Sequence, residues 1–155
     1  MLRSVIDILL HGRKPLNRAA AAYALSLNGK AAILALERSV GNKREHPKVR
    51  GQAAESLAYN HRAKSHHILQ ANLNDLSKEV RFWCAYSLAQ MDEEDALVPL
   101  RKLAERDHRT VKGLWSVSKE ANWAIREIRK EIKKRQRRRK LFCPFCLKTR
   151  QKQPY

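Results

Sequence analysis

The chain has 155 residues, and its 33 Lys and Arg outnumber 15 Asp and Glu, which gives a formal net charge of +18. A charge of that sign favours polyanionic partners, meaning nucleic acid, anionic lipid or an acidic protein. Three cysteines do not make a disulfide framework, and no apolar run is long enough to span a bilayer. Asp7 interrupts the apolar N-terminus and no cleavage site follows, so we expect a cytoplasmic protein with no membrane partner.

Helical periodicity dominates the chain, and period-2 runs of β-branched residues are missing, so strands are not expected. Pro15 and Pro47 stand where the first turn of a helix tolerates proline. Ser65 and Ser77 are expected to cap the helices that follow them, and Leu34 is expected to face inward. In chain order, helices are predicted over residues 2–10, 15–27, 30–40, 47–59, 65–73, 77–90, 96–104 and 116–132.

One stretch of sequence recurs along the chain. Residues 77–90 carry its clearest copy, residues 47–58 a second and residues 15–25 a fainter one. The copies align three arginines at intervals of 32 and 31 residues, namely Arg18, Arg50 and Arg81. Self-similarity at such a period indicates a solenoid of repeated helix pairs.

The repeated motifs carry a family resemblance. Pro-Lys-Val-Arg-x-x-Ala-Ala-Glu-Ser-Leu at 47–57 and Glu-Val-Arg-x-x-x-Ala-x-x-Leu at 79–88 resemble bacterial HEAT-repeat proteins, including the lyase-like HEAT subgroup. The resemblance covers about residues 1–132 and implies an all-α, right-handed α-α solenoid of about 3–4 HEAT-type helix pairs with a basic C-terminal extension. It also implies that the repeated arginines link adjacent repeats as a structural ladder. HEAT repeats serve as adaptors, scaffolds and holders of nucleic acid, so the resemblance is specific for fold and not for function.

The strongest concentration of charge lies at the C-terminal end. We divide the chain into a solenoid over 1–132 and a basic tail over 133–155, and seven of the eight residues in 133–140 are Lys or Arg. Such a run can neutralise phosphates by releasing counterions, and its alternative is a solvated tail or a localisation signal. The residues expected to contact phosphates are the basic residues of this end and of the inner helices, namely Arg126, Arg129, Lys130, Lys133, Lys134, Arg135, Arg137, Arg138, Arg139, Lys140, Lys30, Arg38, Arg101 and Lys102.

The tail also contains Cys143-Pro-Phe-Cys146, whose spacing supplies half of a tetrahedral zinc site. No second Cys-x-x-Cys follows, so a zinc site would need ligands from a partner, from a second copy of the chain or from a distant histidine. The alternatives are a knuckle that docks the tail and an oxidisable pair. No other cofactor is expected.

Several other residues invite a functional interpretation. The acidic segment 92–95 precedes a predicted helix, where the helix dipole explains it better than a cation does. His66 and His67 diverge by about 100° on a helix and are poorly placed for joint ligation, and His61 is taken as another surface histidine. Trp83 and Trp123 lie in apolar stripes and are expected in the core. Trp115 lies outside such a stripe, so its side chain is a candidate for an exposed stacking platform.

These patterns favour binding over catalysis. No nucleophile elbow, phosphate-cradling glycine loop or zinc-protease motif is visible, so no enzyme is expected. The leading hypothesis is an accessory subunit that holds DNA or RNA. The second is a protein–protein adaptor that grips a partner on the concave face, and a remote alternative is a HEAT-like DNA glycosylase, whose aromatic and acidic face we cannot place here. The sequence leaves the oligomeric state open.

Overall fold

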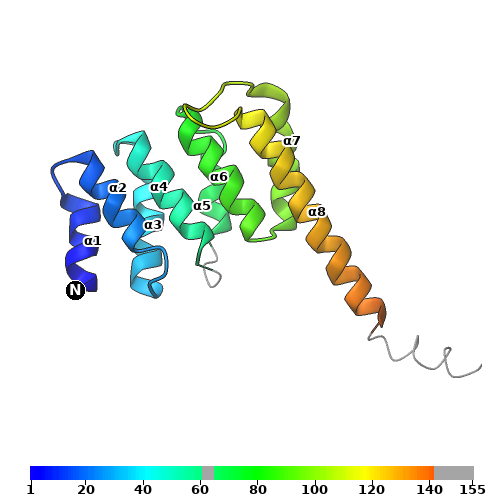
Figure 1. The fold of residues 1–155 in the computed structure, drawn as a ribbon, viewed down its shortest axis with the longest axis horizontal. Helices are drawn as coiled ribbons and strands as arrows, with labels where there is room; N and C mark the ends of the chain where they lie inside the picture. Colours follow the sequence, from blue (N-terminus) through cyan, green and yellow to red (C-terminus); the bar gives the residue numbers. More distant parts are fainter. Residues whose placement is uncertain (61–64, 142–155) are drawn as a thin grey trace, which may run out of the picture.

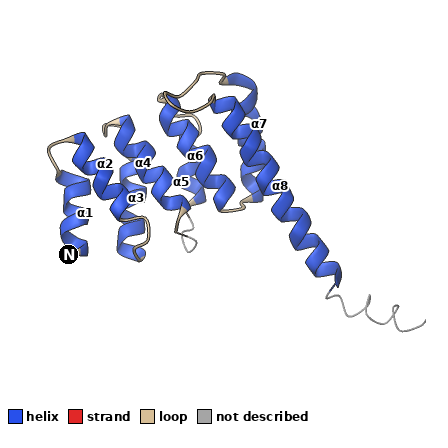
Figure 2. Cartoon of the chain, viewed as in Figure 1, coloured by secondary structure: helices blue, strands red, loops and turns tan. Residues whose placement is uncertain are grey.

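The computed structural model describes residues 1–60 and 65–141. This part of the chain is all-α, as predicted, with no strand and a single isolated bridge between Thr110 and Ser116 (Figures 1 and 2). The elements in order are α1 (Leu2–His11), α2 (Pro15–Ala24), α3 (Lys30–Gly41), α4 (Pro47–Ala58), α5 (His66–Asn72), α6 (Lys78–Gln90), a 3-10 turn η1 (Glu94–Ala96), α7 (Leu97–Arg106) and α8 (Val117–Leu141).

The helices form an α-α solenoid of two layers. Helices α2, α4, α6 and α8 pack side by side in one layer, and α1, α3 and α5 follow one another in the second (Figure 1). Each of these helices packs on the next helix of the first layer, so α1 lies on α2, α3 on α4 and α5 on α6, and α7 continues the second layer by packing on α8. The predicted solenoid is therefore confirmed.

Alanine and leucine build the core of this array. Ala22, Ala53 and Ala85 are fully buried between helices, where a side chain of one carbon lets backbones approach closely. Leu57 and Leu88 fill the space between the layers and are equally buried. The buried apolar residues form one continuous cluster from Leu9 in α1 to Ile128 in α8, so repeats depend on their neighbours for stability.

The prolines begin their helices as predicted, with Pro15 first in α2 and Pro47 first in α4. Three local predictions are wrong. Leu34 points outward and is 56% exposed, because Ala32, Ala35 and Leu36 form the inner side of α3. Ser77 and Ser65 stand at N-cap positions, but neither side chain caps its helix. The hydroxyl of Ser65 instead donates to the Glu37 carboxylate in α3, which leaves the first turn of α5 without a side-chain cap.

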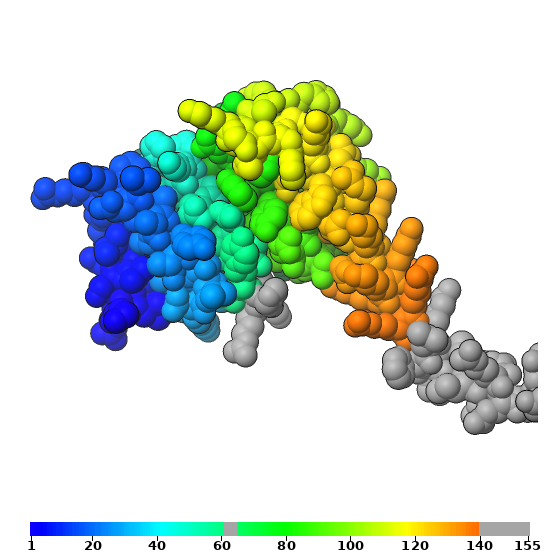
Figure 3. Space-filling view, viewed as in Figure 1, coloured from blue at the N-terminus to red at the C-terminus, as the bar shows by residue number. Residues whose placement is uncertain are grey.

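The last helix changes character along its length. Ile125 and Ile128 are buried and Ile132 packs partly against the core, whereas residues 133–139 are exposed. Because α8 continues unbroken through Leu141, the change near Ile132 is one of exposure and not of secondary structure. The helix projects beyond the packed array (Figure 3). Among the described helices, none has both the length and the apolar composition that crossing a membrane requires.

Candidate nucleic-acid interface

A basic stripe follows one side of α8. Successive residues of a helix turn by about 100°, so residues spaced by three, four, seven or eleven positions lie close to one face. In α8 this spacing aligns five exposed basic residues, which we call the α8 stripe: Arg126, Arg129, Lys130, Lys133 and Arg137. From its first to its last residue the stripe extends about 16 Å along the helix axis. The buried Ile128 and Ile132 lie on the opposite side, so the stripe faces away from the core.

Few carboxylates oppose these charges. Lys130 pairs with Glu127 at 2.7 Å, and Lys134 pairs with Glu131. Arg135 lies 3.2 Å from Asp92, which follows α6. Within residues 1–60 and 65–141, no carboxylate lies within 4 Å of the charged groups of the other four stripe residues. The stripe therefore keeps a charge of about +4 toward solvent.

The remaining predicted contacts are placed as follows. Lys134 and Arg138 are exposed on one side of α8 next to the stripe, whereas Arg135 and Arg139 are exposed on the side of the helix that carries Ile128 and Ile132. Lys140 belongs to the last turn of α8, and its side chain lies outside the described part of the chain. The structure does not bring the inner-helix residues to this surface, because they lie on α3 and α7 as two exposed pairs, Lys30 with Arg38 and Arg101 with Lys102. The intervening helix α5 contains no Lys or Arg, so within residues 1–60 and 65–141 these pairs do not join into one basic surface.

The repeated arginines form the predicted ladder, which is confirmed. Each reaches a carboxylate 25 to 27 residues further along the chain, in the loop after the next helix of the second layer. Arg18 donates to Glu45 at 2.7 and 2.8 Å, Arg50 donates to Asp75 at 2.5 and 3.2 Å, and Arg81 donates to Asp107 at 2.7 Å. Sequence reasoning found the arginines but missed their acidic partners, whose spacing of 30 and 32 residues was the available signal.

We call each of these arginine–carboxylate pairs a rung, and the middle rung, Arg50 with Asp75, has the most complete set of hydrogen bonds. Every guanidinium nitrogen of Arg50 donates: Nε to the carbonyl of Val40, Nη1 to Asp75, and Nη2 to both Asn72 and Asp75. Burial alone would raise the pKa of Asp75, but hydrogen bonds from Arg50, from Lys43 and from a backbone amide outweigh it and lower the pKa to about 2. With both side chains at most 4% exposed, this pair is part of the packing between repeats.

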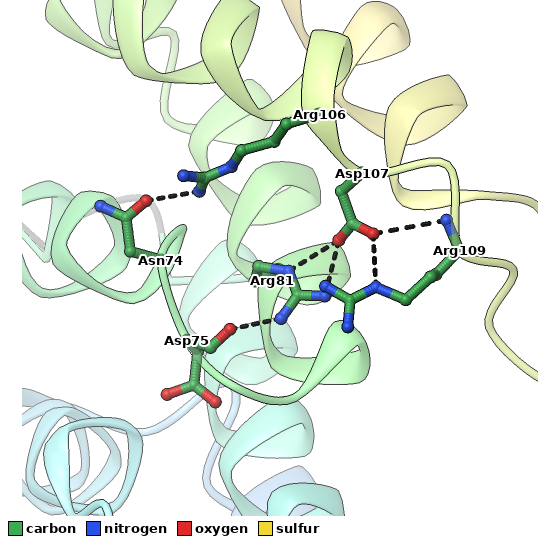
Figure 4. Close-up of a pocket in the computed structure, with 6 residues that line it drawn as sticks. All are labelled: Asn74, Asp75, Arg81, Arg106, Asp107 and Arg109. Atoms are coloured by element: carbon green, nitrogen blue, oxygen red, sulfur yellow. Dashed lines mark hydrogen bonds and ion pairs between the residues drawn. The ribbon is translucent and has the colours of Figure 1, made fainter.

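The third rung opens onto a pocket of about 270 Å³ at the edge of the solenoid (Figure 4). Its lining joins three arginines, two aspartates and one asparagine, namely Arg81, Arg106, Arg109, Asp75, Asp107 and Asn74. The Asp107 carboxylate accepts from Nε of Arg81 at 2.7 Å and from Nε of Arg109 at 2.8 Å. Burial would raise its pKa, but these two arginines together lower it, so the carboxylate stays ionised.

Aromatic side chains lie on successive helices of the layer formed by α2, α4, α6 and α8. Tyr23 of α2 and Tyr59 at the end of α4 are exposed, and the partly buried Tyr86 of α6 stacks on Trp123 with ring centroids 5.8 Å apart. A hydrogen bond with Tyr86 and, to a smaller extent, burial raise the pKa of Tyr59 to about 12. Trp83 also contacts Tyr86, edge to face at 5.7 Å. The prediction that Trp83 and Trp123 belong to the core is thus only partly right, because both are half-buried.

Trp115 is exposed, as the sequence analysis allowed, with 52% of its surface accessible. Its Nε1 donates to the buried carboxylate of Glu120 at 2.6 Å, which ties the loop before α8 to the first turn of that helix. Burial raises the pKa of Glu120 to about 7 in spite of that hydrogen bond. The role of Trp115 as a stacking platform stays a prediction.

The proposed metal ligands Cys143 and Cys146, and also His61, lie outside the described residues. Within the described part, no group of three His, Cys, Asp or Glu side chains is arranged to hold a metal ion. His66 and His67 are neighbours with ring centroids 3.9 Å apart, and Nδ1 of His66 lies 3.5 Å from Glu93 of the acidic segment. Residues Glu94 and Asp95 of that segment belong to η1, and the N-cap of α7 is Ala96.

Residues 42–116, from the loop before α4 through the loop before α8, match the family model of HEAT repeats. The match supports a HEAT-repeat protein, and together with the fold it identifies the architecture as a HEAT-type solenoid. No curated protein matches the sequence. HEAT repeats commonly mediate protein interactions, so the match supports a scaffold or protein-interaction role.

Proposed function

We propose that this solenoid is a non-catalytic accessory protein that holds nucleic acid against the α8 stripe. The supporting observation is the stripe itself: five exposed basic residues on one helical face, of which only Lys130 is paired with a carboxylate in the described structure. A solvated helix gains solubility equally from charges of both signs, whereas a one-sided stripe suits a polyanion. The aromatic residues that cross the same layer offer π-faces beside it, which favours single strands.

The length and charge of the stripe set the expected strength of binding. Five basic residues over about 16 Å can meet about five phosphates of a nucleic-acid strand. Each phosphate that is neutralised contributes about −0.7 to the slope of log K against log salt for a single strand and about −0.9 for duplex DNA. We therefore expect a slope between about −3.5 and −4.5, with little dependence on sequence, because phosphate contacts position a strand without reading its bases.

The test compares two variants that lose the same charge. In the first, Arg126, Lys133 and Arg137 of the stripe are replaced by Gln. In the second, Lys30→Gln, Arg38→Gln and Arg101→Gln remove three exposed charges from α3 and α7. Binding of full-length protein to labelled single- and double-stranded DNA and RNA is measured by fluorescence anisotropy between 50 and 200 mM salt, values that bracket physiological ionic strength (about 150 mM).

We expect the stripe variant to reduce the magnitude of the salt slope by about 2 to 3, as three lost phosphate contacts require. The control variant is expected to keep the slope within about 1 of the wild type. Equal losses in both variants would show that net charge alone causes binding, and would refute an interface on α8. No measurable binding of any strand by the wild type would refute a nucleic-acid partner altogether.

A second candidate, a protein adaptor, is favoured by a groove of about 350 Å³ between α4 and α6. Gly51 lacks a side chain there, so Trp83 and the 111–114 loop form apolar walls around a space that a partner side chain can occupy. A partner that is captured by the wild type and by the stripe variant, but lost on Leu114→Glu, would support this function. Its retention by Leu114→Glu would place the contact elsewhere.

A further inference from the structure

The pocket of the third rung has an excess of positive charge. Three guanidinium groups line it, from Arg81, Arg106 and Arg109. Of its two aspartates, only Asp107 directs its carboxylate to these arginines, while the carboxylate of Asp75 is held by the neighbouring rung and only its carbonyl oxygen accepts from Arg81. Three positive groups against one carboxylate leave the pocket with a formal charge of +2.

The pocket also contains donors that have no protein acceptor. Arg81 is not one of them, because its buried Nη2 forms an ion pair with the Asp107 carboxylate at 2.6 Å. Arg106 uses only Nη2, toward the Leu73 carbonyl and the Asn74 side chain, and Arg109 uses only Nε. In the described part of the chain, Nε and Nη1 of Arg106 and both terminal nitrogens of Arg109 thus remain available.

The preceding rung shows what a purely structural arrangement looks like. All three nitrogens of Arg50 have acceptors there, one of which is the amide oxygen of Asn72, three residues before the aspartate. Three residues before Asp107 the chain has Ala104, which offers no such acceptor. The third rung therefore has one acceptor group fewer than the second, and the free donors of Arg106 and Arg109 beside it can bind an oxygen-rich ligand.

We propose that this pocket binds the phosphate group of a phosphomonoester. A monoester carries a charge of about −1.5 to −2 at pH 7 and three terminal oxygens, which match a +2 site with several arginine donors. A carboxylate carries half that charge and two oxygens. The pocket lies where the loops after α5 and α7 meet, away from the α8 stripe, so the inference does not rest on the proposed function.

The test uses inorganic phosphate, O-phosphoserine and a 5′-phosphorylated oligonucleotide with its unphosphorylated counterpart. Binding to the full chain is measured by calorimetry at pH 7.5 and constant ionic strength, with sulfate as the reference anion. Arg106→Gln with Arg109→Gln removes the two exposed arginines of the pocket, and Arg101→Gln with Lys102→Gln removes the same charge from α7 outside it. Arg106→Gln alone leaves every hydrogen bond of Asp107 in place.

The expected result is saturable binding of phosphate and phosphoserine, weakened at least tenfold by the pocket double variant, several-fold by Arg106→Gln and less than twofold by the control. The stripe variant of α8 is expected to keep this binding, which separates the two proposals. A preference for the phosphorylated oligonucleotide over its counterpart would identify nucleic-acid ends as the source, and phosphoserine binding without that preference would identify a small or peptide-borne monoester. Binding of sulfate as tight as that of phosphate, or no loss in the pocket variant, would overturn the proposal.

Discussion

Asp75→Asn tests the view that the arginine ladder holds adjacent repeats together. The substitution preserves the shape of the side chain but removes the charge that faces Arg50 and Lys43. Arg50 is 3% exposed, so its guanidinium would stay buried without an ionised partner. Breaking a buried pair in this way costs about 3–5 kcal/mol, a large part of the stability of a single domain.

The pH dependence provides an independent estimate. The folded pKa of Asp75 is about 2, below the ordinary value of 3.8 for an aspartate, so its carboxylate stabilises the fold above the unfolded pKa and this contribution is lost as pH falls toward 2. A shift of that size corresponds to about 2 kcal/mol at pH 7 and about 1 kcal/mol at pH 3. The difference between wild type and variant should therefore narrow by about 1 kcal/mol between these two values.

Urea unfolding followed by circular dichroism at pH 7 and pH 3 measures both quantities. Glu105→Gln is the control, since it removes the same charge from an exposed position on α7 and should change the unfolding free energy by less than about 0.5 kcal/mol. A loss below about 1 kcal/mol for Asp75→Asn at pH 7 would refute the reasoning, because the rung would then contribute no more than a surface ion pair. So would a loss that is the same at both pH values.

Three further predictions concern other buried groups. Since burial raises the folded pKa of Glu120 to about 7, its protonated form is favoured on folding and stability should fall as pH rises from about 4.5 to 7. We expect the unfolding free energy to fall by about 2–3 kcal/mol by pH 8, and we expect Glu120→Gln, which keeps an acceptor for Trp115, to lack this fall. Urea titrations measure the pH profile, and a profile unchanged by the substitution would contradict the prediction. Cys84 is fully buried and its pKa is raised by burial, so mass spectrometry should find it unmodified by a thiol reagent until urea unfolds the chain, and rapid labelling of the native protein would show the opposite. Gly51→Ala would place a carbon 2.9 Å from Trp83, so it should shift tryptophan fluorescence and cost about 1–3 kcal/mol, whereas an unaltered spectrum would mean that the groove accommodates the methyl group.

Much of the fold was predictable because the repeat is written in local spacing. Recurrent arginines, helix-starting prolines and alanine-rich stripes depend only on the helical period and on the length of one helix pair. The errors occurred where a competing local contact decided the result. Leu34 satisfies the helical period but lies outside the buried face, and the hydroxyl of Ser65 bonds Glu37 in α3 instead of its own helix.

The candidate sites were less accessible from sequence. The basic residues of α8 were identified, but their alignment into a stripe required the helix to continue past Ile132 to Leu141. The pocket combines residues from the loops after α5 and α7 with Arg81 of α6, so no single motif contains it. The tyrosines stand near the ends of successive helices of one layer, and only the packing of α6 on α8 brings Tyr86 onto Trp123.

The amino-acid sequence by itself determined that this chain is an all-α array of repeated helix pairs with a strongly basic end, because helix period, repeat length and net charge are properties of residues near one another in the chain. The tertiary structure decided which charges are available. Arg50 and Arg81 occupy equivalent positions in their repeats, yet packing encloses the first with Asn72 and Asp75 and places the second at an open pocket where Arg106 and Arg109 keep free donors. Hydrogen-bond partners 25 residues or more away are fixed by how helices stack, and that stacking separates a structural arginine from one with capacity to bind a ligand.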